Sequence, residues 1–125
     1  MTFARAATGT RAEDLAAALL ESRGYRIVAR NWRRPEGELD LVAEDAGVCV
    51  FVEVRSRTGE DFGSPLETVN PRKRGRVIRA ARLYLDAEPL FASVFRFDVV
   101  GVTFHQDGRA PELVHVEDAF RVDRD

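Results

Sequence analysis

Residues 38–55 read ELDLVAEDAGVCVFVEVR, and this stretch decides the predicted fold. It contains two strand candidates, residues 38–44 and 48–55, joined through residues 45–47. The second candidate is apolar on both faces until Glu53, a pattern typical of a strand in the centre of a sheet. Side chains two apart on a strand share a face, so the charged residues of each strand point the same way.

The charged groups of this hairpin converge if Ala46-Gly47 is a two-residue turn. In that register Asp40 lies opposite Glu53, with Cβ atoms about 4.5–5.5 Å apart. Glu38 then lies opposite Arg55. Two carboxylates this close repel each other unless a proton or a cation joins them, and oxygen ligands favour Mg²⁺ or Mn²⁺. The alternatives are a three-residue loop, which separates the pairs, and a surface hairpin whose ion pairs contribute less than about 1 kcal/mol each.

Two helices and three further strand candidates surround the hairpin. A first helix is predicted over about residues 11–23, because residues 10–13 form a capping box before an apolar stripe. A second helix is predicted over about residues 71–86, with Asn70 as its N-cap and Pro71 at its first position. The β-prone segments are residues 25–29, 95–104 and, as an edge strand, 112–116.

The element order αβββαβ, with the extra edge strand, predicts an α/β fold with a mixed central sheet flanked by helices. We expect one domain over residues 10–117, between a flexible tail at 1–9 and an acidic tail at 118–125. Residues 58–68 carry two glycines, a proline and three acids, and they are predicted to form a long loop.

Composition excludes several classes of protein. The chain has 125 residues, 45% of them hydrophobic and 32% charged, which fits one globular domain with a proper core. The single cysteine, Cys49, excludes an internal disulfide and a cysteine-rich zinc site, and we expect it to be buried. The apolar runs fall far short of the ~18 residues of a membrane span, and no secretory signal is visible. The expected location is therefore cytoplasmic, with no membrane partner.

The charges are segregated along the chain, although the net charge is only −2. Residues 72–82 contain six basic residues and no acid. On a helical projection Arg72, Arg76 and Arg79 share one face, and Arg82 lies at its flank. A solvated amphipathic face is the usual explanation of a charge run, but such a face normally mixes acids with bases. Phosphate contact is therefore the favoured interpretation.

Two further residues have two interpretations each. Trp32, among arginines, is a candidate for stacking on an unpaired base, and packing over the core is its alternative. Asp98 interrupts an apolar strand, so it is either buried against a partner or close to the site.

Six segments, in order over about residues 9–102, resemble the YraN family of small bacterial proteins. They are residues 9–13, Asn31 with 37–41, 51–57, Phe62-Gly63 with Pro65, Lys73, and 96–100. That family is similar to Holliday-junction resolvases and restriction endonucleases, the PD-(D/E)xK nuclease superfamily. The resemblance implies a restriction-endonuclease-like αβββαβ core and a nuclease-like function on nucleic acid, DNA more than RNA.

The resemblance also implies a site. Asp40 matches the first metal-binding aspartate, and Glu53 matches the acidic residue of the (D/E)xK element. Glu13 matches the acid of the first helix that is often found beside them, although the capping box also explains it. Glu38 matches the family's Gly-Glu-Ile-Asp element, with a strand-edge carboxylate paired to an arginine as the alternative. The implied metal ligands, for Mg²⁺ or Mn²⁺, are Asp40, Glu53 and Glu13.

Arg55 departs from the superfamily pattern, which has lysine at this position. A guanidinium with a pKa above about 12 cannot act as a base, but it can hold a phosphate through a bidentate contact. Lys73 is the only lysine of the chain. On the helical projection it lies at the edge of the buried face, where it reaches either the sheet or solvent.

The sequence thus supports three hypotheses. The first is a metal-dependent nuclease-like protein, branched DNA being one substrate, with catalytic residues Asp40, Glu53, Arg55, Glu13 and Lys73 and nucleic-acid-binding residues Arg72, Arg76, Arg79, Arg82 and Arg57. The second is a non-catalytic nucleic-acid-binding module that lost activity through arginine at the lysine position. The third is a protein-interaction domain, which ranks last. A symmetric homodimer would suit a junction substrate.

Overall fold

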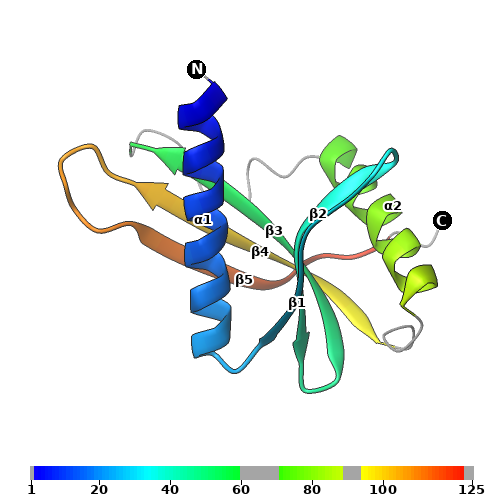
Figure 1. The fold of residues 1–125 in the computed structure, drawn as a ribbon. Helices are drawn as coiled ribbons and strands as arrows, with labels where there is room; N and C mark the ends of the chain where they lie inside the picture. The colour runs from blue at the N-terminus through cyan, green and yellow to red at the C-terminus, as the bar shows by residue number, and fades with distance from the viewer. Residues whose placement is uncertain (1, 60–70, 89–93, 123–125) are drawn as a thin grey trace.

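One mixed sheet with a helix on each face makes up the fold (Figure 1). The computed structural model describes residues 2–59, 71–88 and 94–122. The strands follow chain order across the sheet; β3 and β4 run parallel and the other neighbours antiparallel. This confirms the predicted α/β class and αβββαβ order. The elements are α1 (Thr2–Ser22), β1 (Arg26–Arg34), β2 (Gly37–Asp45), β3 (Val48–Thr58), α2 (Pro71–Ala87), β4 (Phe95–Phe104) and β5 (Glu112–Phe120).

The first helix begins earlier than predicted. It starts at Thr2, so the expected capping box at residues 10–13 is wrong, because those residues lie inside the helix. Residues 2–9, expected as a tail, belong to the helix as well. What holds α1 on the sheet is a buried stripe spaced four residues apart, Ala12, Ala16 and Leu20.

Four strands, β1, β2, β3 and β5, extend beyond their predicted bounds, and β1 and β5 do so most. β1 continues to Arg34, and β5 continues to Phe120, whose ring is buried, so residues 118–120 are not part of a tail. The predicted helix at 71–86 is confirmed as α2. Asn70, most of the predicted loop at 58–68 and the motif residues within it lie outside the described residues.

Side chains of β3 alternate between two hydrophobic cores. One core faces α1 and includes Val50 and Val52, and the other faces α2 and includes Cys49 and Phe51. This alternation sends the next residue, Glu53, to the α2 side. The expected burial of Cys49 is confirmed. None of the helices in the described part of the chain is both long and apolar enough to cross a membrane.

Candidate functional site

The turn between β2 and β3 sets the register of the site. Ala46 and Gly47 both have positive φ, 50° and 87°, as a two-residue hairpin turn of this twist requires. Asp45 therefore pairs with Val48, and the pairing continues to Leu41 opposite Val52. The backbone pairing stops one position short of Asp40 and Glu53, but a side-chain hydrogen bond still joins their carboxyl groups.

β2 parts from β3 at Asp40. The last paired residues of the two strands are Leu41 and Val52. Beyond this pair, the Asp40 Oδ2 atom accepts a hydrogen bond of 2.8 Å from the backbone N–H of Val54. Leu39 and Leu41 are two residues apart but lie in different cores, Leu39 facing α2 and Leu41 facing α1. The outer end of the β1–β2 hairpin thus turns toward α2 (Figure 1).

A cleft of about 200 Å³ lies where the two strands part. It brings together five of the residues that the sequence assigned to the site, Asp40 and Glu53 from the strands with Arg55, Lys73 and Arg76. Its full lining is Glu38, Asp40, Glu53, Val54, Arg55, Lys73, Arg76 and Val77. Among the described residues no group of three or more His, Cys, Asp or Glu side chains is gathered closely enough to hold a metal ion. The compact donor set is the Asp40–Glu53 pair.

Glu53 is an unusual acid in this cleft. Its side chain is only 11% exposed. Burial, and then hydrogen bonding to Asp40 and the charge of Asp40, raise the pKa of Glu53 to about 9, although Arg55 opposes the shift. Glu53 therefore keeps its proton at neutral pH, and a cation placed between Glu53 and Asp40 would replace that proton.

Arg55 stands next to Glu53 on the same face of β3. Its Nη2 atom donates to Glu53 Oε2 at 3.3 Å, and its side chain is 22% exposed. Its Nε atom is buried and has no hydrogen-bond partner among the described residues. An unsatisfied guanidinium donor at the wall of a cleft favours an acceptor that arrives with a ligand, such as a phosphate oxygen.

Glu13 does not line the cleft. Its carboxylate accepts a hydrogen bond from Asn31 Nδ2 at 3.0 Å. Burial and the charge of Asp40 raise the pKa of Glu13, whereas the Asn31 bond and nearby arginines lower it. Glu13 is therefore within electrostatic reach of Asp40. Asn31 is part of one of the six motif segments, but the sequence alone does not predict its hydrogen bond to Glu13.

Glu38 makes an ordinary exposed ion pair. The predicted pairing with Arg55 is wrong, because β2 has already turned away, and Glu38 instead meets Arg33 at 3.0 Å. This contact matches the alternative expectation for Glu38, a strand-edge carboxylate paired to an arginine. Arg57, unlike Glu38, does not line the cleft, and its Nε atom donates to Thr103 Oγ1 at 3.4 Å.

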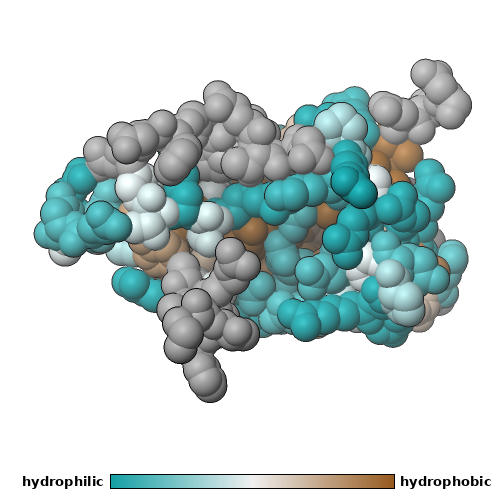
Figure 2. Space-filling model, turned by 90° about the horizontal axis from the view of Figure 1, so that it is seen from above, coloured by the Kyte–Doolittle hydropathy of each residue, from teal (hydrophilic) through white to brown (hydrophobic). Residues whose placement is uncertain are grey.

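The arginines of α2 are exposed. Within the described part of the chain, no acid forms an ion pair with Arg72, Arg76, Arg79 or Arg82, all of which are exposed. Three arginines of β1 contrast with them, because each pairs with an acid: Arg26 with Glu44, Arg30 with Asp14, and Arg33 with Glu38. Seen from above, the described surface is mainly hydrophilic, with apolar residues confined to recesses and one end (Figure 2).

Trp32 packs on the α2 side of the hairpin rather than offering a free face. The Trp32 ring meets the Tyr84 ring edge-on, with 5.4 Å between the two centroids. The Arg34 guanidinium lies over the Trp32 ring, 4.0 Å from the centroid of that ring. The packing alternative therefore describes Trp32 better than base stacking does.

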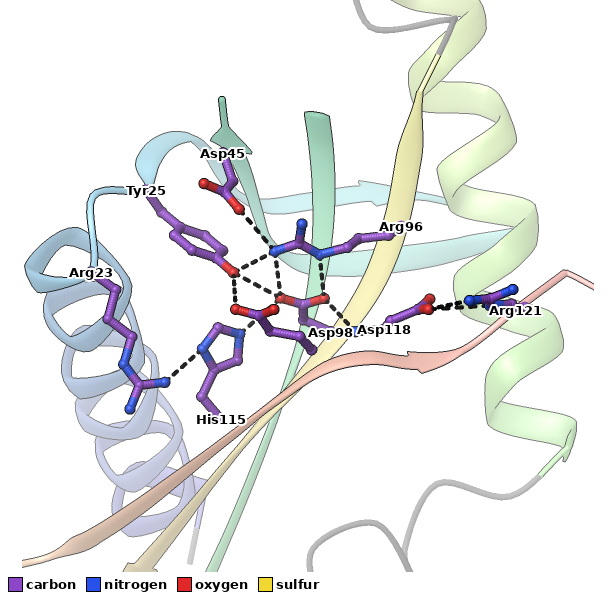
Figure 3. Close-up of polar contacts among 9 residues, drawn as sticks. Arg23, Tyr25, Asp45, Arg96, Asp98, His115, Asp118 and Arg121 are labelled. Carbon is purple, nitrogen blue, oxygen red and sulfur yellow. Dashed lines mark hydrogen bonds and ion pairs between the residues drawn. The ribbon is translucent and has the colours of Figure 1, made fainter. Parts of the chain in front are cut away.

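Asp98 belongs to a buried polar network on the other face of the sheet (Figure 3). It is fully buried and pairs in register with Val52, which faces α1. His115 meets its Oδ2 at 2.8 Å, and Arg96 and the Asp118 N–H donate to Oδ1 at 3.0 Å. Burial alone would raise the pKa of Asp98, but these hydrogen bonds hold it below its usual value. Asp98 is thus a structural residue, separate from the cleft.

A second hollow, of about 720 Å³, lies beside the start of β4 and the end of β5. Its two arginines are already paired, Arg96 with Asp98 and Asp45, and Arg121 with Asp118. The hollow is larger than the cleft, but acids among the described residues already hold both of its arginines, whereas the cleft offers the unpartnered Nε–H group of Arg55.

Known proteins resemble this chain along most of its length. A family model described as "Uncharacterised protein family UPF0102" matches residues 12–102, which include the whole cleft. A UPF0102 protein of Nitratidesulfovibrio vulgaris (strain DP4) is 47% identical over 120 residues, 96% of this chain and 88% of the relative. Another, of Pelotomaculum thermopropionicum, is 45% identical over 120 residues, 96% of this chain and 100% of the relative. A third, of Clostridium perfringens (strain SM101), is 43% identical over 110 residues, 88% of this chain and 90% of the relative. The chain therefore belongs to the UPF0102 (YraN) family.

Proposed function

We propose that this protein is a metal-dependent nuclease-like protein that hydrolyses nucleic-acid phosphodiesters, with branched DNA among its substrates. The observation that carries the proposal is the single cleft in which the Asp40–Glu53 pair meets Arg55, Lys73 and Arg76. Paired carboxylates suit a hard divalent cation, and the three basic side chains suit the oxygens of a phosphate.

The residues present fit Mg²⁺ or Mn²⁺. Mg²⁺ is commonly held by one or two carboxylates together with phosphate oxygens of the substrate, and Asp40 and Glu53 supply those carboxylates. A divalent cation bound there would acidify a water molecule and neutralise charge on the phosphoryl oxygens. In hydrolysis a bond forms from a water oxygen to phosphorus, and the bond to the leaving ester oxygen breaks as that oxygen takes up a proton.

The basic residues bind and stabilise charge rather than accept protons. A guanidinium group carries only hydrogen-bond donors, so Arg55 offers its buried Nε–H and its terminal groups to the phosphate. Lys73 and Arg76 approach from α2 on the opposite wall, and the arginines farther along that helix continue the positive surface. Contacts of this kind hold the backbone without reading its sequence.

A cleavage assay tests the proposal. A labelled panel of single-stranded DNA, duplex, flap, four-way junction and RNA is incubated with Mg²⁺ or Mn²⁺. We expect cutting of DNA by the wild type and at least about a hundred-fold less cutting by Asp40→Asn and Glu53→Gln. The amide introduced by Asp40→Asn keeps a carbonyl oxygen for the Val54 N–H, so the fold should be retained. If both variants cut as fast as the wild type, the cutting comes from a contaminating nuclease and the proposal is contradicted.

The second candidate function is a nucleic-acid-binding module without hydrolysis. Arg55 favours it, because a lysine able to lose its proton is absent from that strand position. This candidate predicts salt-sensitive binding of the same panel by wild type and Asp40→Asn alike, with no cutting in either metal. A homodimer would suit a two-fold junction substrate, and analytical ultracentrifugation with and without the junction tests it.

A further inference from the structure

Arg34, at the end of β1, is held in place by contacts other than an acid. Its guanidinium group lies over the Trp32 ring, and its Nη1 atom donates to the Arg33 carbonyl oxygen at 2.6 Å. Among the described residues no acid forms an ion pair with Arg34, and no hydrogen bond engages its Nε or Nη2 atom. The side chain is exposed, so these donors remain open to a ligand.

The ring that carries Arg34 is itself fixed by α2. Trp32 packs against the core that faces α2, and its ring meets the Tyr84 ring edge-on. A cation over the face of an indole ring is attracted by the electrons of that ring. The Arg34 guanidinium is therefore ordered before a ligand arrives, and binding through it loses less rotamer entropy than binding through an unrestrained arginine does.

Arg34 lies beside the cleft, on the face of the sheet that α2 covers. It stands opposite Gly37 in the pairing of β1 with β2, and residues directly opposite each other share a face. The Cβ position of Gly37 meets the backbone carbonyl oxygen of Arg76, whose residue lines the cleft. This end of the hairpin lies next to α2 (Figure 1). The positive surface therefore continues from the cleft, past Arg76, to Arg34.

We infer that Arg34, stacked on Trp32, binds a backbone phosphate of the nucleic acid that occupies the cleft. A guanidinium group stacked through its flat face keeps its edge free, and the N–H groups along that edge match the oxygens of a phosphate. The contact extends the binding surface from α2 across the end of the β1–β2 hairpin. Trp32 serves as a platform and touches no base. This inference rests on the proposed function, because it takes the ligand to be a nucleic acid.

The test measures binding of a labelled four-way junction by the full-length protein, by fluorescence anisotropy with Ca²⁺ in place of Mg²⁺. We expect Arg34→Gln to bind about five- to ten-fold more weakly at about 100 mM NaCl. It should also reduce the slope of log K against log salt by about 0.9, the share of one phosphate contact. Arg26→Gln is the matched control, since it removes the same charge from the same strand, but from an arginine that pairs with Glu44. Its affinity should stay within about two-fold of wild type.

A second variant tests the platform. Arg34→Lys keeps the charge and loses the flat group that stacks on the ring, so we expect the salt slope of the wild type with about three-fold weaker binding. Affinity equal to that of the wild type would show that the stack does not matter, and the inference would fail.

The outcomes also separate this inference from the proposed function. If the wild type binds the junction and Arg34→Gln binds it as tightly as Arg26→Gln does, the inference fails and the proposed function stands. A wild type that binds neither the junction nor single-stranded DNA or RNA overturns both.

Discussion

At the scale of one residue, Glu53 lowers the stability of the folded state. A carboxyl group with 11% of its side chain exposed, beside a second carboxyl group, opposes folding whenever both are ionised. A hydrophobic or amide side chain of similar size would fit β3 without that cost. Retaining a group that opposes folding is typical of functional sites.

The raised pKa of Glu53 makes stability depend on pH in a defined direction. The folded pKa is about 9 and the ordinary value is 4.5, so the folded state binds more protons than the unfolded state between these values. Stability therefore falls as pH rises through that window. We expect Glu53→Gln to raise the free energy of unfolding by about 1–2 kcal/mol at pH 8 and by less at pH 5, measured by urea denaturation. Glu36→Gln, in the exposed turn after β1, is the control, and a gain independent of pH would contradict the argument.

The placement of Asp40 and Glu53 near each other was predictable because its signals are local. A two-residue turn with glycine fixes the register, and alternation along the strands fixes the face. The position of Glu13 beside Asn31 was not predictable in this way, since it depends on where α1 lies across β1. The buried setting of Asp98 was equally undetermined, because its partners Arg96 and His115 come from two strands and a third partner is a backbone amide.

At the scale of elements, close backbone packing places α2 over the cleft. Gly37 begins β2 and is buried against α2, and a Cβ atom there would overlap the backbone carbonyl oxygen of Arg76. The glycine of the Gly-Glu-Leu-Asp motif therefore sets the distance between the hairpin and the helix that supplies Lys73 and Arg76. The motif in the sequence includes this glycine, but the sequence alone does not explain why glycine is needed there.

Replacing Gly37 should displace α2. We expect Gly37→Ala to lower the free energy of unfolding by about 1–3 kcal/mol, because backbone atoms have to move apart. Gly9→Ala is the matched control, since Gly9 lies inside α1 with open space at its Cβ position, and it should raise stability by about 0.5–1 kcal/mol. Both values come from urea denaturation followed by circular dichroism. A Gly37→Ala protein as stable as wild type would show that α2 is not held in this way.

The buried network ties the turn after α1 to β4 and β5 through His115. Arg23 carries only donors, so the His115 Nδ1 atom, 2.9 Å from its Nη1, must accept. The ring hydrogen then lies on Nε2 and is donated to Asp98. We expect ¹⁵N spectra to place the ring hydrogen of His115 on Nε2, and a hydrogen on Nδ1 would contradict this. His115→Ala should cost about 1–3 kcal/mol of stability, and His115→Gln, which keeps a donor, should cost less.

Across the whole molecule, local signals predicted the architecture better than its boundaries. The hairpin, the second helix and the strand order were readable because turn residues and apolar periodicity mark them. The start of α1 was not, because residues 10–13 fit a capping box although the helix continues through them to Thr2. β5 extends past Val116 because Phe120 is buried in the core that faces α2, a tertiary contact without a local mark.

Within the described part of the chain, α2 carries a group of exposed arginines that pair with no acid, and the salt dependence of DNA binding should report them. Replacing Arg72, Arg79 and Arg82 together by Gln should weaken DNA binding and reduce the slope of log K against log salt by about 2–3 units, because each lost phosphate contact accounts for about 0.9. The control removes the same charge from arginines that pair with acids, Arg26, Arg109 and Arg121. It should change the slope by less than about 1 unit. Fluorescence anisotropy of a labelled duplex between 50 and 300 mM NaCl, about the range where such slopes are resolved, supplies both values. Equal slopes for the two triple variants would mean that DNA contacts no particular face, and α2 would lose its assignment as the binding surface.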